Sequence, residues 1–395
     1  MKIVHVVDYF QPKLGYQEVF LAKEQAKLGH EIFVITSDRY SPILYDENDA
    51  SSILGSRIRP HGFFIEDRIK VFRLKTLFEF SSRVWTLGLE DTIRKLNPDV
   101  INVDGFNRIT AFRVALLKLK SKEHLKFKLV IDDHNNPSAS RSRLKILYPV
   151  LRYTFFPIIF KAADALVAVS NTTRIFMHEK YGLPLDRIKV IPLGADTTTF
   201  KFDKMARHEL RIKLGITDND IVFIYTGKIV TYKYVHLLVS AAISLMKRHH
   251  NLKVLLVGYG DKLYKRQLQI KIKSEGCIEN FIWHEAVPNK ELCKYFSAAD
   301  IAVYPHQHTN SILEAMACGL PVIVSDEARA SEEVAYENGL TYKDGELPDL
   351  VKKMEILALD KNLRIKMGRK GRKIVHEKFN WETIAKEFIK IYESC

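Results

Sequence analysis

The sequence predicts an α/β protein with two doubly wound parallel sheets. Short apolar segments alternate with helical patterns from the first residues, and the same alternation starts again near residue 221. A chain of 395 residues is longer than one hydrophobic core usually serves. Its composition, 47% apolar and 27% charged, is ordinary for a globular protein. We therefore expect two domains of about 190 residues each, with the ligand crevice between their sheets.

The first expected domain is built from apolar strands that end in polar turns. Residues 17–28 have helical periodicity, and Gly29 and His30 interrupt that helix before the next apolar run. The expected strands are residues 3–7, 31–36, 100–103, 128–131, 165–169 and 188–191.

The second expected domain repeats this pattern. Its strands are expected at residues 221–225, 253–257, 281–284, 301–304 and 322–325, with a helix over residues 235–248. Near the end of the chain, residues 381–392 have an amphipathic helical pattern. Its apolar positions are Ile384, Ala385, Phe388, Ile391 and Tyr392.

The charge of the chain is strongly positive and unevenly distributed. The formal net charge is +14, and residues 108–161 hold twelve Lys and Arg against three Asp and Glu. Such an excess favours an anionic partner, namely a membrane surface, a phosphorylated lipid or a nucleic acid. Because the sequence contains no zinc finger, aromatic RNA motif or DNA-reading helix, no nucleic-acid partner is expected.

Residues 141–160 combine basic residues with aliphatic and aromatic ones. Such a segment can enter the headgroup layer of a membrane, or it can form a core helix with a basic outer face. Pro149 and Pro157 are expected to limit any helix there. No stretch approaches the roughly 20 apolar residues of a spanning helix. Residues 1–7 are expected to form a strand rather than a signal peptide. The four cysteines form no CxxC pair, as is common for a protein of a reducing compartment. We expect a cytoplasmic protein with a peripheral attachment to the inner face of the membrane.

Residues 306–326 are the most informative segment for function. They predict a polar turn, a short helix, a Gly-Leu-Pro break and a buried strand. Thr309, Asn310 or Ser311 can cap the helix, whose first N–H groups would offer an anion site. Glu314 follows one turn into the helix, where its carboxylate could accept hydrogen bonds from the vicinal hydroxyls of a ribose. The alternative is a capping box, in which Glu314 only bonds a backbone N–H.

Other turns after expected strands carry further candidate groups. Lys228 and Lys233 flank a strand-to-helix turn and could neutralise a departing diphosphate. Gly15 lies in the turn after the first strand, where the backbone could approach a phosphate or a sugar. His134 follows the strand at residues 128–131 and could donate to a sugar hydroxyl or to the reaction centre, while Asp132 and Asp133 could position it. A buried histidine with a structural role is the alternative.

Several motifs occur in order over nearly the whole chain. They are Gly29-His30-Glu31, Ile191-Pro192-Leu193-Gly194-Ala195-Asp196, Gly227-Lys228 with Lys233, Ala298-Ala299-Asp300, residues 313–323 and Phe379-Asn380-Trp381. With these motifs the chain resembles the retaining, nucleotide-sugar-dependent glycosyltransferases of family 4, also described as glycosyl transferases group 1. The resemblance implies the GT-B fold, with two Rossmann-like domains that face a central crevice. It implies an acceptor-binding domain at residues 1–195, a nucleotide-sugar-binding domain at 196–378, and a helix at 379–395 that packs back on the first domain.

The resemblance also implies roles for matched residues on the donor side. Glu314 matches the glutamate that holds the donor ribose. Lys228 and Lys233 match the basic pair on the donor diphosphate, although arginine is more usual at the first position. Asn310 and Ser311 match the helix start that receives phosphate.

Other matched positions agree with the family or depart from it. His134 matches the histidine that faces the donor sugar, and Gly15 matches the first of a glycine pair near phosphate and acceptor. The second glycine of that pair is Tyr16 here, which should narrow the cleft. The glutamate that usually contacts the donor sugar is His306, and Arg329-Ala330 stands where the family often has glycines.

Together these features predict a retaining glycosyltransferase that uses a nucleoside-diphosphate sugar. The expected acceptor is a glycan or a lipid-linked glycan, in cell-surface polysaccharide or glycolipid synthesis, and His134, Lys228 and Lys233 are the expected catalytic residues. His306 and His308 lack further ligands at a recognised spacing, so neither a metal nor another cofactor is expected. The alternatives are a nucleotide-sugar epimerase or sugar phosphorylase on the same fold, and a non-catalytic sugar-binding homologue.

Overall fold

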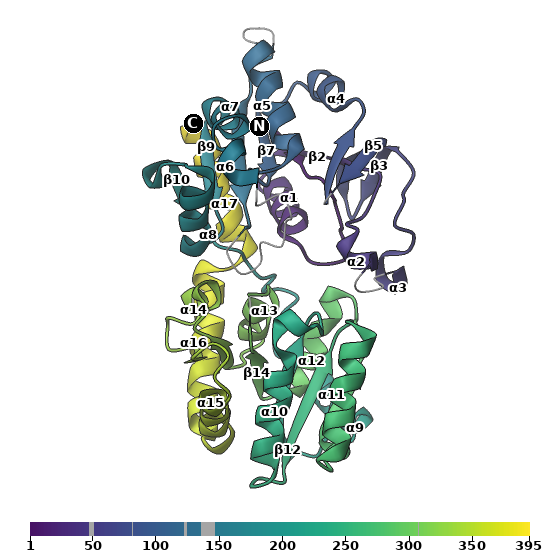
Figure 1. Cartoon of the computed structure of the whole chain (residues 1–395), viewed down its shortest axis with the longest axis vertical. Helices are drawn as coiled ribbons and strands as arrows, with labels where there is room; N and C mark the ends of the chain where they lie inside the picture. Colours follow the sequence, from purple (N-terminus) through teal and green to yellow (C-terminus); the bar gives the residue numbers. More distant parts are fainter. Residues whose placement is uncertain (47–50, 81, 122–124, 136–146, 307) are drawn as a thin grey trace. The chain divides into compact units, whose positions relative to one another are not determined.

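The computed structural model describes residues 1–46, 51–80, 82–121, 125–135, 147–306 and 308–395. The chain forms two compact units, each built around its own sheet (Figure 1). Unit 1 comprises Met1–Tyr45, Leu54–Leu193 and Trp381–Cys395, and unit 2 comprises Asp46–Ile53 and Gly194–Asn380.

Unit 1 contains an eight-stranded sheet in the order β10-β9-β8-β7-β1-β2-β4-β3. Neighbouring strands run parallel except β3, which pairs antiparallel with β4. All six strands predicted for this part of the chain are present, and the strand order reverses beside β1, where open α/β sheets bind ligands. The strands are β1 (Lys2–Val6), β2 (Glu31–Ser37), β3 (Gly62–Glu66), β4 (Ile69–Leu74), β7 (Val100–Asp104), β8 (Lys128–Asp133), β9 (Ala165–Ala168) and β10 (Ile188–Val190).

Two hairpins within residues 62–86 were not predicted. The turn between β3 and β4 holds Asp67 and Arg68, both with positive φ, as a tight two-residue hairpin requires. β5 (Thr76–Phe80) and β6 (Arg83–Thr86) form a separate two-stranded hairpin. β4 alternates between buried and more exposed residues, but large apolar side chains of β3 and β5 remain exposed, so these two strands lack the pattern of a half-buried strand.

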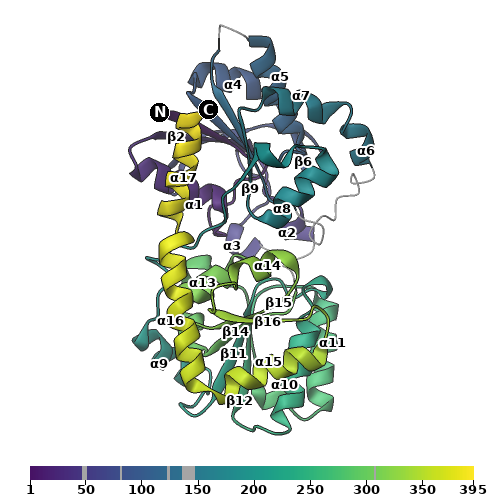
Figure 2. The ribbon, with the colours of Figure 1, turned by 90° about the vertical axis from the view of Figure 1, so that its left-hand side faces the viewer.

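Helices cover both faces of the unit 1 sheet (Figure 2). Val4 and Val6 of β1 belong to a core shared with α5 and α7. His5 points to the opposite face, where it bonds Gln25 of α1 at 2.7 Å. The helices are α1 (Gln17–Lys27), α2 (Ile43–Asp46), α3 (Ser51–Leu54), α4 (Leu89–Leu96), α5 (Ile109–Ser121), α6 (Tyr148–Leu151), α7 (Phe155–Ala162), α8 (Asn171–Phe176) and α17 (Trp381–Ser394).

The last helix, α17, packs on α1 within unit 1. The ring of Trp381 stacks on that of Phe20 with the centroids 5.4 Å apart. All five apolar positions predicted for this helix are buried, so the predicted amphipathic face is confirmed.

Unit 2 contains a six-stranded parallel sheet in the order β13-β12-β11-β14-β15-β16. The five predicted strands are present, and the sixth, β16, was not predicted. A Cβ on Gly339 at the start of β16 would lie 2.3 Å from the carbonyl oxygen of Val322, so only glycine fits at this position. Because glycine is disfavoured in strands, the sequence pattern did not indicate this edge strand. The strands are β11 (Ile221–Thr226), β12 (Leu252–Val257), β13 (Phe281–His284), β14 (Ile301–Tyr304), β15 (Val322–Ser325) and β16 (Gly339–Tyr342).

The helices of unit 2 form two groups around this sheet (Figure 2). One group, α10 with α11 and α15, packs together, and α12 packs with α9 and α13. The helices are α9 (Lys204–Lys213), α10 (Val235–Met246), α11 (Lys262–Ser274), α12 (Leu292–Ala298), α13 (Ser311–Ala317), α14 (Ala328–Glu333), α15 (Leu347–Leu359) and α16 (Lys361–Lys378). Two doubly wound parallel sheets confirm the predicted fold class.

In the described part of residues 141–160 the prolines limit the helices, as expected, because each of two short helices has one of them in its first turn. Pro149 lies at the start of α6 and Pro157 in the first turn of α7, where no intrahelical N–H bond is lost. Phe156 and Ile159 are buried, as in the core-helix alternative, whereas Tyr153 is 81% exposed. Residues 141–146, including three of the basic ones, lie outside the described residues.

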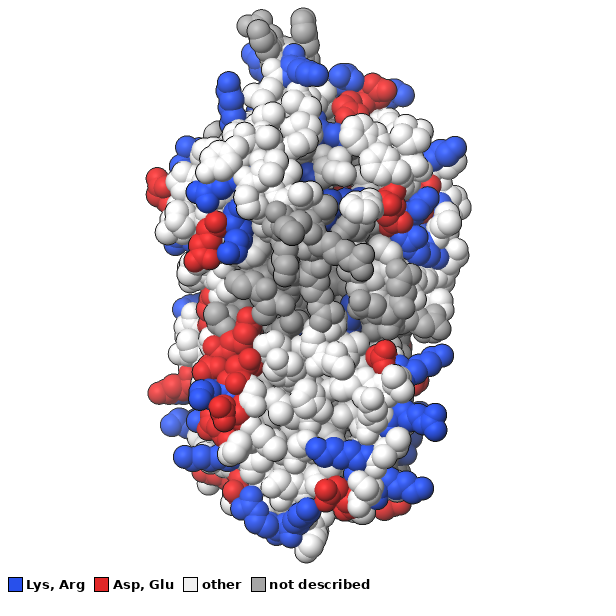
Figure 3. Space-filling model, in the orientation of Figure 1, with Lys and Arg blue, Asp and Glu red and all other residues white. Residues whose placement is uncertain are grey.

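The basic excess of residues 108–161 is partly used inside unit 1. Arg113 forms a buried ion pair with Glu90, Lys118 pairs with Asp164, and Lys128 donates to the carbonyl oxygen of Tyr392 at 2.7 Å. On the face of unit 1 visible in Figure 3, Lys and Arg are scattered among uncharged residues. Among the described residues, no helix is both long and apolar enough to cross a bilayer.

Candidate functional site

Glu314, on α13 of unit 2, carries a buried carboxylate that is 3% exposed. Its Oε1 accepts a 2.7 Å hydrogen bond from Nδ2 of Asn289. Its Oε2 is buried and has no partner in hydrogen-bonding geometry among the described residues. Burial raises the pKa of Glu314 to about 7, opposed by the neighbouring side chains of Asn289 and Ser311. A buried carboxylate with one oxygen unused is suited to accept hydrogen bonds from a ligand.

The capping box that could have explained Glu314 is not formed. The helix begins at Ser311, and the side chain of its N-cap residue Asn310 makes no capping hydrogen bond. The Glu314 side chain instead accepts its hydrogen bond from Asn289, 25 residues away. Glu314 therefore ties α13 to another segment of unit 2, and Ser311 at the start of its own helix also favours its charged form.

Lys233 lies beside the loop that leads into α13. It ends the short 3-10 turn η4 (Thr231–Lys233) that precedes α10. Its Nζ donates a 2.9 Å hydrogen bond to the carbonyl oxygen of His308, so two segments 75 residues apart meet here. Lys228 follows β11, and its carbonyl oxygen accepts a 2.7 Å hydrogen bond from the hydroxyl of Tyr225. Both lysines thus lie in the turns at the carboxyl end of β11, as predicted.

The turns after β11 and β12 are in direct backbone contact. The N–H of Ile229 donates to the carbonyl oxygen of Tyr259 at 2.8 Å. A Cβ on Gly258 would lie 1.9 Å from the carbonyl oxygen of Gly227, and one on Gly260 would lie 2.0 Å from that of Ile229. Only glycine allows this approach, which fixes the turn that carries Lys228.

His306 and His308 are engaged with different carboxylates. Nδ1 of His306 lies 2.7 Å from Oδ1 of Asp344, and its ring stacks on Tyr234 with the centroids 4.2 Å apart. Nε2 of His308 lies 2.6 Å from Oε1 of Glu333. The two histidines therefore do not converge on one point, and His306 is held by a carboxylate and an aromatic ring.

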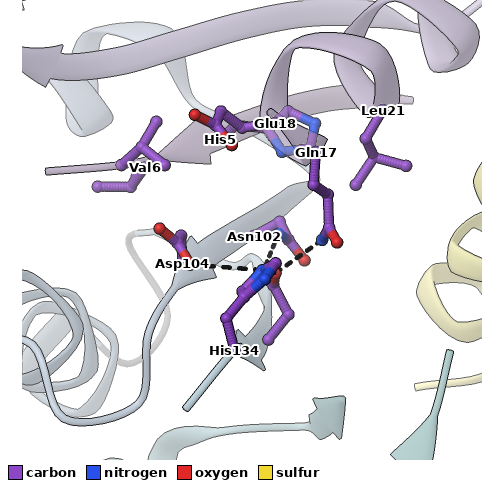
Figure 4. Close-up of a pocket in the computed structure, with 10 residues that line it drawn as sticks. His5, Val6, Gln17, Glu18, Leu21, Asn102, Asp104 and His134 are labelled. Carbon is purple, nitrogen blue, oxygen red and sulfur yellow. Dashed lines mark hydrogen bonds and ion pairs between the residues drawn. The ribbon is translucent and has the colours of Figure 1, made fainter. Parts of the chain in front are cut away.

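His134 lies in a small polar pocket of unit 1, at the carboxyl ends of β7 and β8 (Figure 4). Its Nε2 is 3.1 Å from Oδ2 of Asp132 and 3.7 Å from Oδ1 of Asp104. Asp132 is buried and accepts 2.8 Å hydrogen bonds from the side-chain amides of Gln17 and Asn102. The pocket measures about 10 Å³, which is close to the space of one water molecule.

The sequence predicted only part of this pocket. Asp133, which was expected to help position His134, instead accepts hydrogen bonds from the backbone N–H groups of Phe106 and Asn135. Asp104 takes its place. Asn102 and Asp104 alternate along β7, and two polar residues near the end of a buried strand were the signal that could have identified them.

Two carboxyl groups that line this pocket have raised pKa values. Burial raises the pKa of Asp104 to about 6; His134 opposes the rise and Asp132 adds to it. Burial, with a smaller effect of Asp104, raises the pKa of Glu18, which also lines the pocket, to about 8. The ligand atoms of Asp104, Asp132 and His134 lie within 4.8 Å of one another. The 3.1 Å contact of His134 with Asp132 suits a shared proton, and the three groups together have the spacing that a cation would need.

Gly15 and Tyr16 form the turn that leads into α1. Gly15 has a φ of 70°, in the left-handed region that favours glycine. Tyr16 is the N-cap residue of α1, and its side chain makes no capping hydrogen bond. The helix that follows begins with Gln17 and Glu18, so this turn positions two residues of the His134 pocket.

Comparison with solved structures shows a GT-B fold. The HepE protein of Anabaena, solved in complex with UDP, aligns with a TM-score of 0.77 at 18% identity and covers 100% of both chains. Two parallel-sheet units with functional groups at the carboxyl ends of their strands thus define the class of protein as GT-B.

The family follows from two sequence matches that together span most of the chain. Residues 19–199 match the family model described as Glycosyltransferase Family 4, and residues 206–374 match the one described as Glycosyl transferases group 1. This chain belongs to the family 4, group 1 glycosyltransferases.

Individual relatives are distant. An uncharacterized glycosyltransferase of Methanocaldococcus jannaschii is 25% identical over 235 residues, which is 58% of this chain and 59% of that protein. A D-inositol 3-phosphate glycosyltransferase of Nocardia farcinica is 29% identical over 258 residues, 62% of this chain and 56% of that protein. The chain therefore spans between half and two thirds of the length of these two relatives.

Proposed function

We propose that this protein transfers a sugar from a nucleoside-diphosphate sugar to a hydroxyl of a glycan or lipid-linked glycan, with retention of the anomeric configuration. The observation that carries the proposal is the buried Glu314 carboxylate with its unused Oε2. Hydrogen bonds from the two hydroxyls of a ribose would satisfy that oxygen. In the proposed assignment of domains, unit 2 binds the nucleotide sugar and unit 1 binds the acceptor.

The diphosphate of the donor is assigned to Lys233 and Lys228. Lys233 contacts the loop that leads into α13, so a phosphate near this ammonium group would also lie near Asn310 and Ser311. Because α13 has only seven residues, its dipole is a minor contribution and the lysines supply the charge. Charge on the diphosphate grows as the glycosidic bond breaks, and fixed cations stabilise it most at that point.

The donor sugar is assigned to His306 and His134. His306 occupies the family position that contacts the donor sugar, and its fixed ring can donate or accept a hydrogen bond there. His134 is oriented by Asp132, which two amides hold in place. In this proposal the ring, oriented by Asp132, faces a hydroxyl of the donor sugar. Gly15 is assigned to the backbone approach of donor phosphate and acceptor.

The proposed reaction breaks the bond between the anomeric carbon and the diphosphate oxygen. The acceptor oxygen forms the new bond on the face that the diphosphate leaves, and the proton of the acceptor hydroxyl passes to the departing phosphate oxygen. This route needs no carboxylate nucleophile, and the lysines supply the charge that a metal would otherwise provide. A lipid-linked acceptor would place the protein at the inner face of the membrane in glycolipid or polysaccharide synthesis.

A panel of nucleotide sugars, screened by thermal shift and then with candidate acceptors, tests the proposal. A bound donor at 100 times its Kd should add about 2.7 kcal/mol to the free energy of unfolding. The product should keep the anomeric configuration of the donor, as NMR of the new linkage would show. Release of free phosphate, or interconversion of the sugar without acceptor, would identify a phosphorylase or an epimerase. Donor binding without turnover on any acceptor would favour a non-catalytic homologue.

A further inference from the structure

Three arginines lie together on two paired segments of unit 1. Arg39 follows β2, and Arg57 and Arg59 flank the residue that bridges to it. The N–H of Tyr40 donates to the carbonyl oxygen of Arg57 at 2.9 Å, and the N–H of Arg59 donates to that of Asp38 at 2.7 Å. These backbone bonds hold the three guanidinium groups in one region.

The three arginines share few carboxylates. Nη1 of Arg39 lies 3.1 Å from Oε2 of Glu79, and Nη2 of Arg57 pairs with Oε1 of the same residue. The hydroxyl of Tyr9 donates to that Oε1 as well, at 2.6 Å. The Arg59 guanidinium lies over the ring of Tyr40, 5.8 Å from its centroid. One carboxylate therefore serves two guanidinium groups and a phenol.

A second pair of arginines lies nearby, around Asp8. Nη1 of Arg108 is 3.7 Å from Oδ2 of Asp8. Arg83 is 6% exposed, and its pKa is lowered by burial and by the charge of Arg108. Glu79 is close enough to Asp8 to raise the pKa of that carboxyl, although burial is the larger cause. The two groups of arginines are thus neighbours.

The cluster has few carboxylates at ion-pair distance. The five arginines have Asp8, Asp38 and Glu79 close by, and Arg108 also feels the charges of Asp104 and Asp133. The Nε–H donors of four of the arginines are buried and have no hydrogen-bond partner among the described residues. One of them, Nε of Arg39, lies 3.8 Å from Oδ1 of Asp38, which is within ion-pair distance but too long for a hydrogen bond. Buried donors of this kind often mark an ion or water that the protein binds. The four are Arg39, Arg57, Arg59 and Arg108.

The position of this arginine cluster within the fold is that of a ligand site. Asp8 and Tyr9 follow β1, Arg39 follows β2, and Arg108 follows β7, all at the carboxyl end of the parallel sheet. The side chains of Arg39, Arg57 and Arg108 are 24 to 28% exposed, so an anion can reach them from solvent. Arg108 also contributes to the electrostatics of Asp104, beside His134.

We propose that Arg39, Arg57, Arg59 and Arg108 bind a phosphate or diphosphate group carried by the acceptor. Guanidinium groups bind phosphate oxygens in bidentate fashion, and the buried Nε–H donors of the cluster can serve the several oxygens of a phosphate or diphosphate. The proposal rests on the proposed function and adds the chemical class of its acceptor. Phe78 and Phe80, on either side of Glu79 in β5, are 46% and 62% exposed, so the phosphate could belong to a free sugar phosphate or to a lipid.

Calorimetric titration of the full chain with inorganic pyrophosphate tests the site. We expect two classes of binding, one weakened by Lys233→Ala and the other by Arg57→Gln or Arg59→Gln, each by about 10- to 100-fold. Arg94→Gln serves as the matched control, because Arg94 is an exposed arginine of unit 1 that pairs only with Asp91 among the described residues. Arg57→Lys keeps the charge but loses the bidentate fork, so its affinity should lie between those of the wild type and Arg57→Gln, which separates charge from folding.

The outcomes separate the two proposals. Wild-type affinity in both Arg57→Gln and Arg59→Gln, or loss of all binding in Lys233→Ala alone, would overturn the arginine site and leave the donor proposal standing. Binding lost only in the arginine variants would contradict the donor proposal and keep this one. Phosphatidylcholine vesicles with and without polyprenyl diphosphate distinguish the sources. Arginine-dependent binding to the diphosphate vesicles indicates a lipid carrier, and binding of free pyrophosphate alone indicates a soluble phosphorylated acceptor.

Discussion

The side-chain amide of Asn289 donates a 2.7 Å hydrogen bond to Oε1 of Glu314 and leaves Oε2 of that buried carboxylate without a partner among the described residues. Because burial raises the pKa of Glu314 to about 7, the carboxyl group is close to half ionised at neutral pH. A ligand hydroxyl that donates to Oε2 would favour the ionised form. Ligand binding and ionisation of Glu314 are therefore expected to be linked.

Nucleotide-sugar affinity should rise with pH through the pKa of Glu314. Only the ionised carboxylate accepts two further hydrogen bonds, so binding should weaken about tenfold between pH 8 and pH 6 if the pKa is about 7. Titration calorimetry at several pH values would measure this. Glu314→Gln should bind more weakly by roughly 1.5–3 kcal/mol and with a flatter pH profile. A profile that is the same in both proteins would assign the pH dependence to the phosphate and not to Glu314.

Glu314→Gln should also stabilise the unliganded protein at pH 8. The folded pKa of about 7 exceeds the ordinary value of 4.5, so the ionised carboxylate destabilises the fold. This cost grows as pH rises from about 4.5 to about 7 and is then constant, on the order of 3–4 kcal/mol at most. Urea unfolding at pH 8 and at pH 4 would test it, with a gain expected only at pH 8. Lower stability of the variant at pH 8 would instead give Glu314 a structural role.

Lys233→Ala should reduce turnover more than donor binding. Its Nζ lies at the loop before α13, and charge on a departing diphosphate is greatest near the transition state. We expect kcat to fall by about 10- to 1000-fold, with a smaller change in KM. Lys228→Ala should have the same sign and a smaller effect if water enters its turn. Small and equal changes in kcat and KM for both variants would argue against leaving-group stabilisation.

His306→Glu should shift donor preference towards common hexoses. An imidazole can donate one hydrogen bond and accept another, whereas a carboxylate only accepts. The structure adds a complication, because Asp344 lies 2.7 Å from Nδ1 of His306 and would repel a new carboxylate. The double variant His306→Glu/Asp344→Asn removes that repulsion and is the proper comparison. Rates with a donor panel should change in both variants, and an unchanged order of donors would leave His306 as a packing residue.

The sequence predicted the parallel sheets because their buried strands are nearly continuous apolar runs. β7 and β15, for example, are Val-Ile-Asn-Val-Asp and Val-Ile-Val-Ser. It did not predict β5, whose Phe78 and Phe80 stay exposed, since periodicity reports burial and these side chains are not buried.

Residues of the candidate site could be predicted only where their role is visible in one short segment of the sequence. Lys233 and Glu314 stood out because each lies in a turn or helix start with recognisable spacing. Asn289 and Asp344 could not be found this way, because their importance comes from tertiary contacts with residues 25 and 38 positions away. The same applies to Asp104, which the fold and not the local sequence brings to His134.

Membrane attachment is the last expectation to test, and the structure narrows which residues should matter. Arg113, Lys118 and Lys128 are already paired within unit 1, so they should contribute little to lipid binding. Arg141, Arg143 and Lys145 lie outside the described residues, next to a segment in which Val150 and Tyr153 are 60% and 81% exposed. This combination of basic residues with exposed apolar ones is the one that enters an anionic interface.

Changing Arg141, Arg143 and Lys145 to serine should therefore reduce binding to anionic liposomes. Each basic residue near such a surface contributes about 1 kcal/mol, so removing three should weaken partitioning about 100-fold. Co-sedimentation should require anionic lipid and weaken as salt shortens the Debye length from roughly 10 Å at 0.1 M. The double variant Lys120→Ser/Lys126→Ser removes two charges elsewhere in the basic region and serves as a control with a smaller expected effect. Tyr153→Ser should weaken binding with little change in its salt dependence. Equal binding to neutral and anionic liposomes, or none to either, would remove the membrane and favour a soluble acceptor.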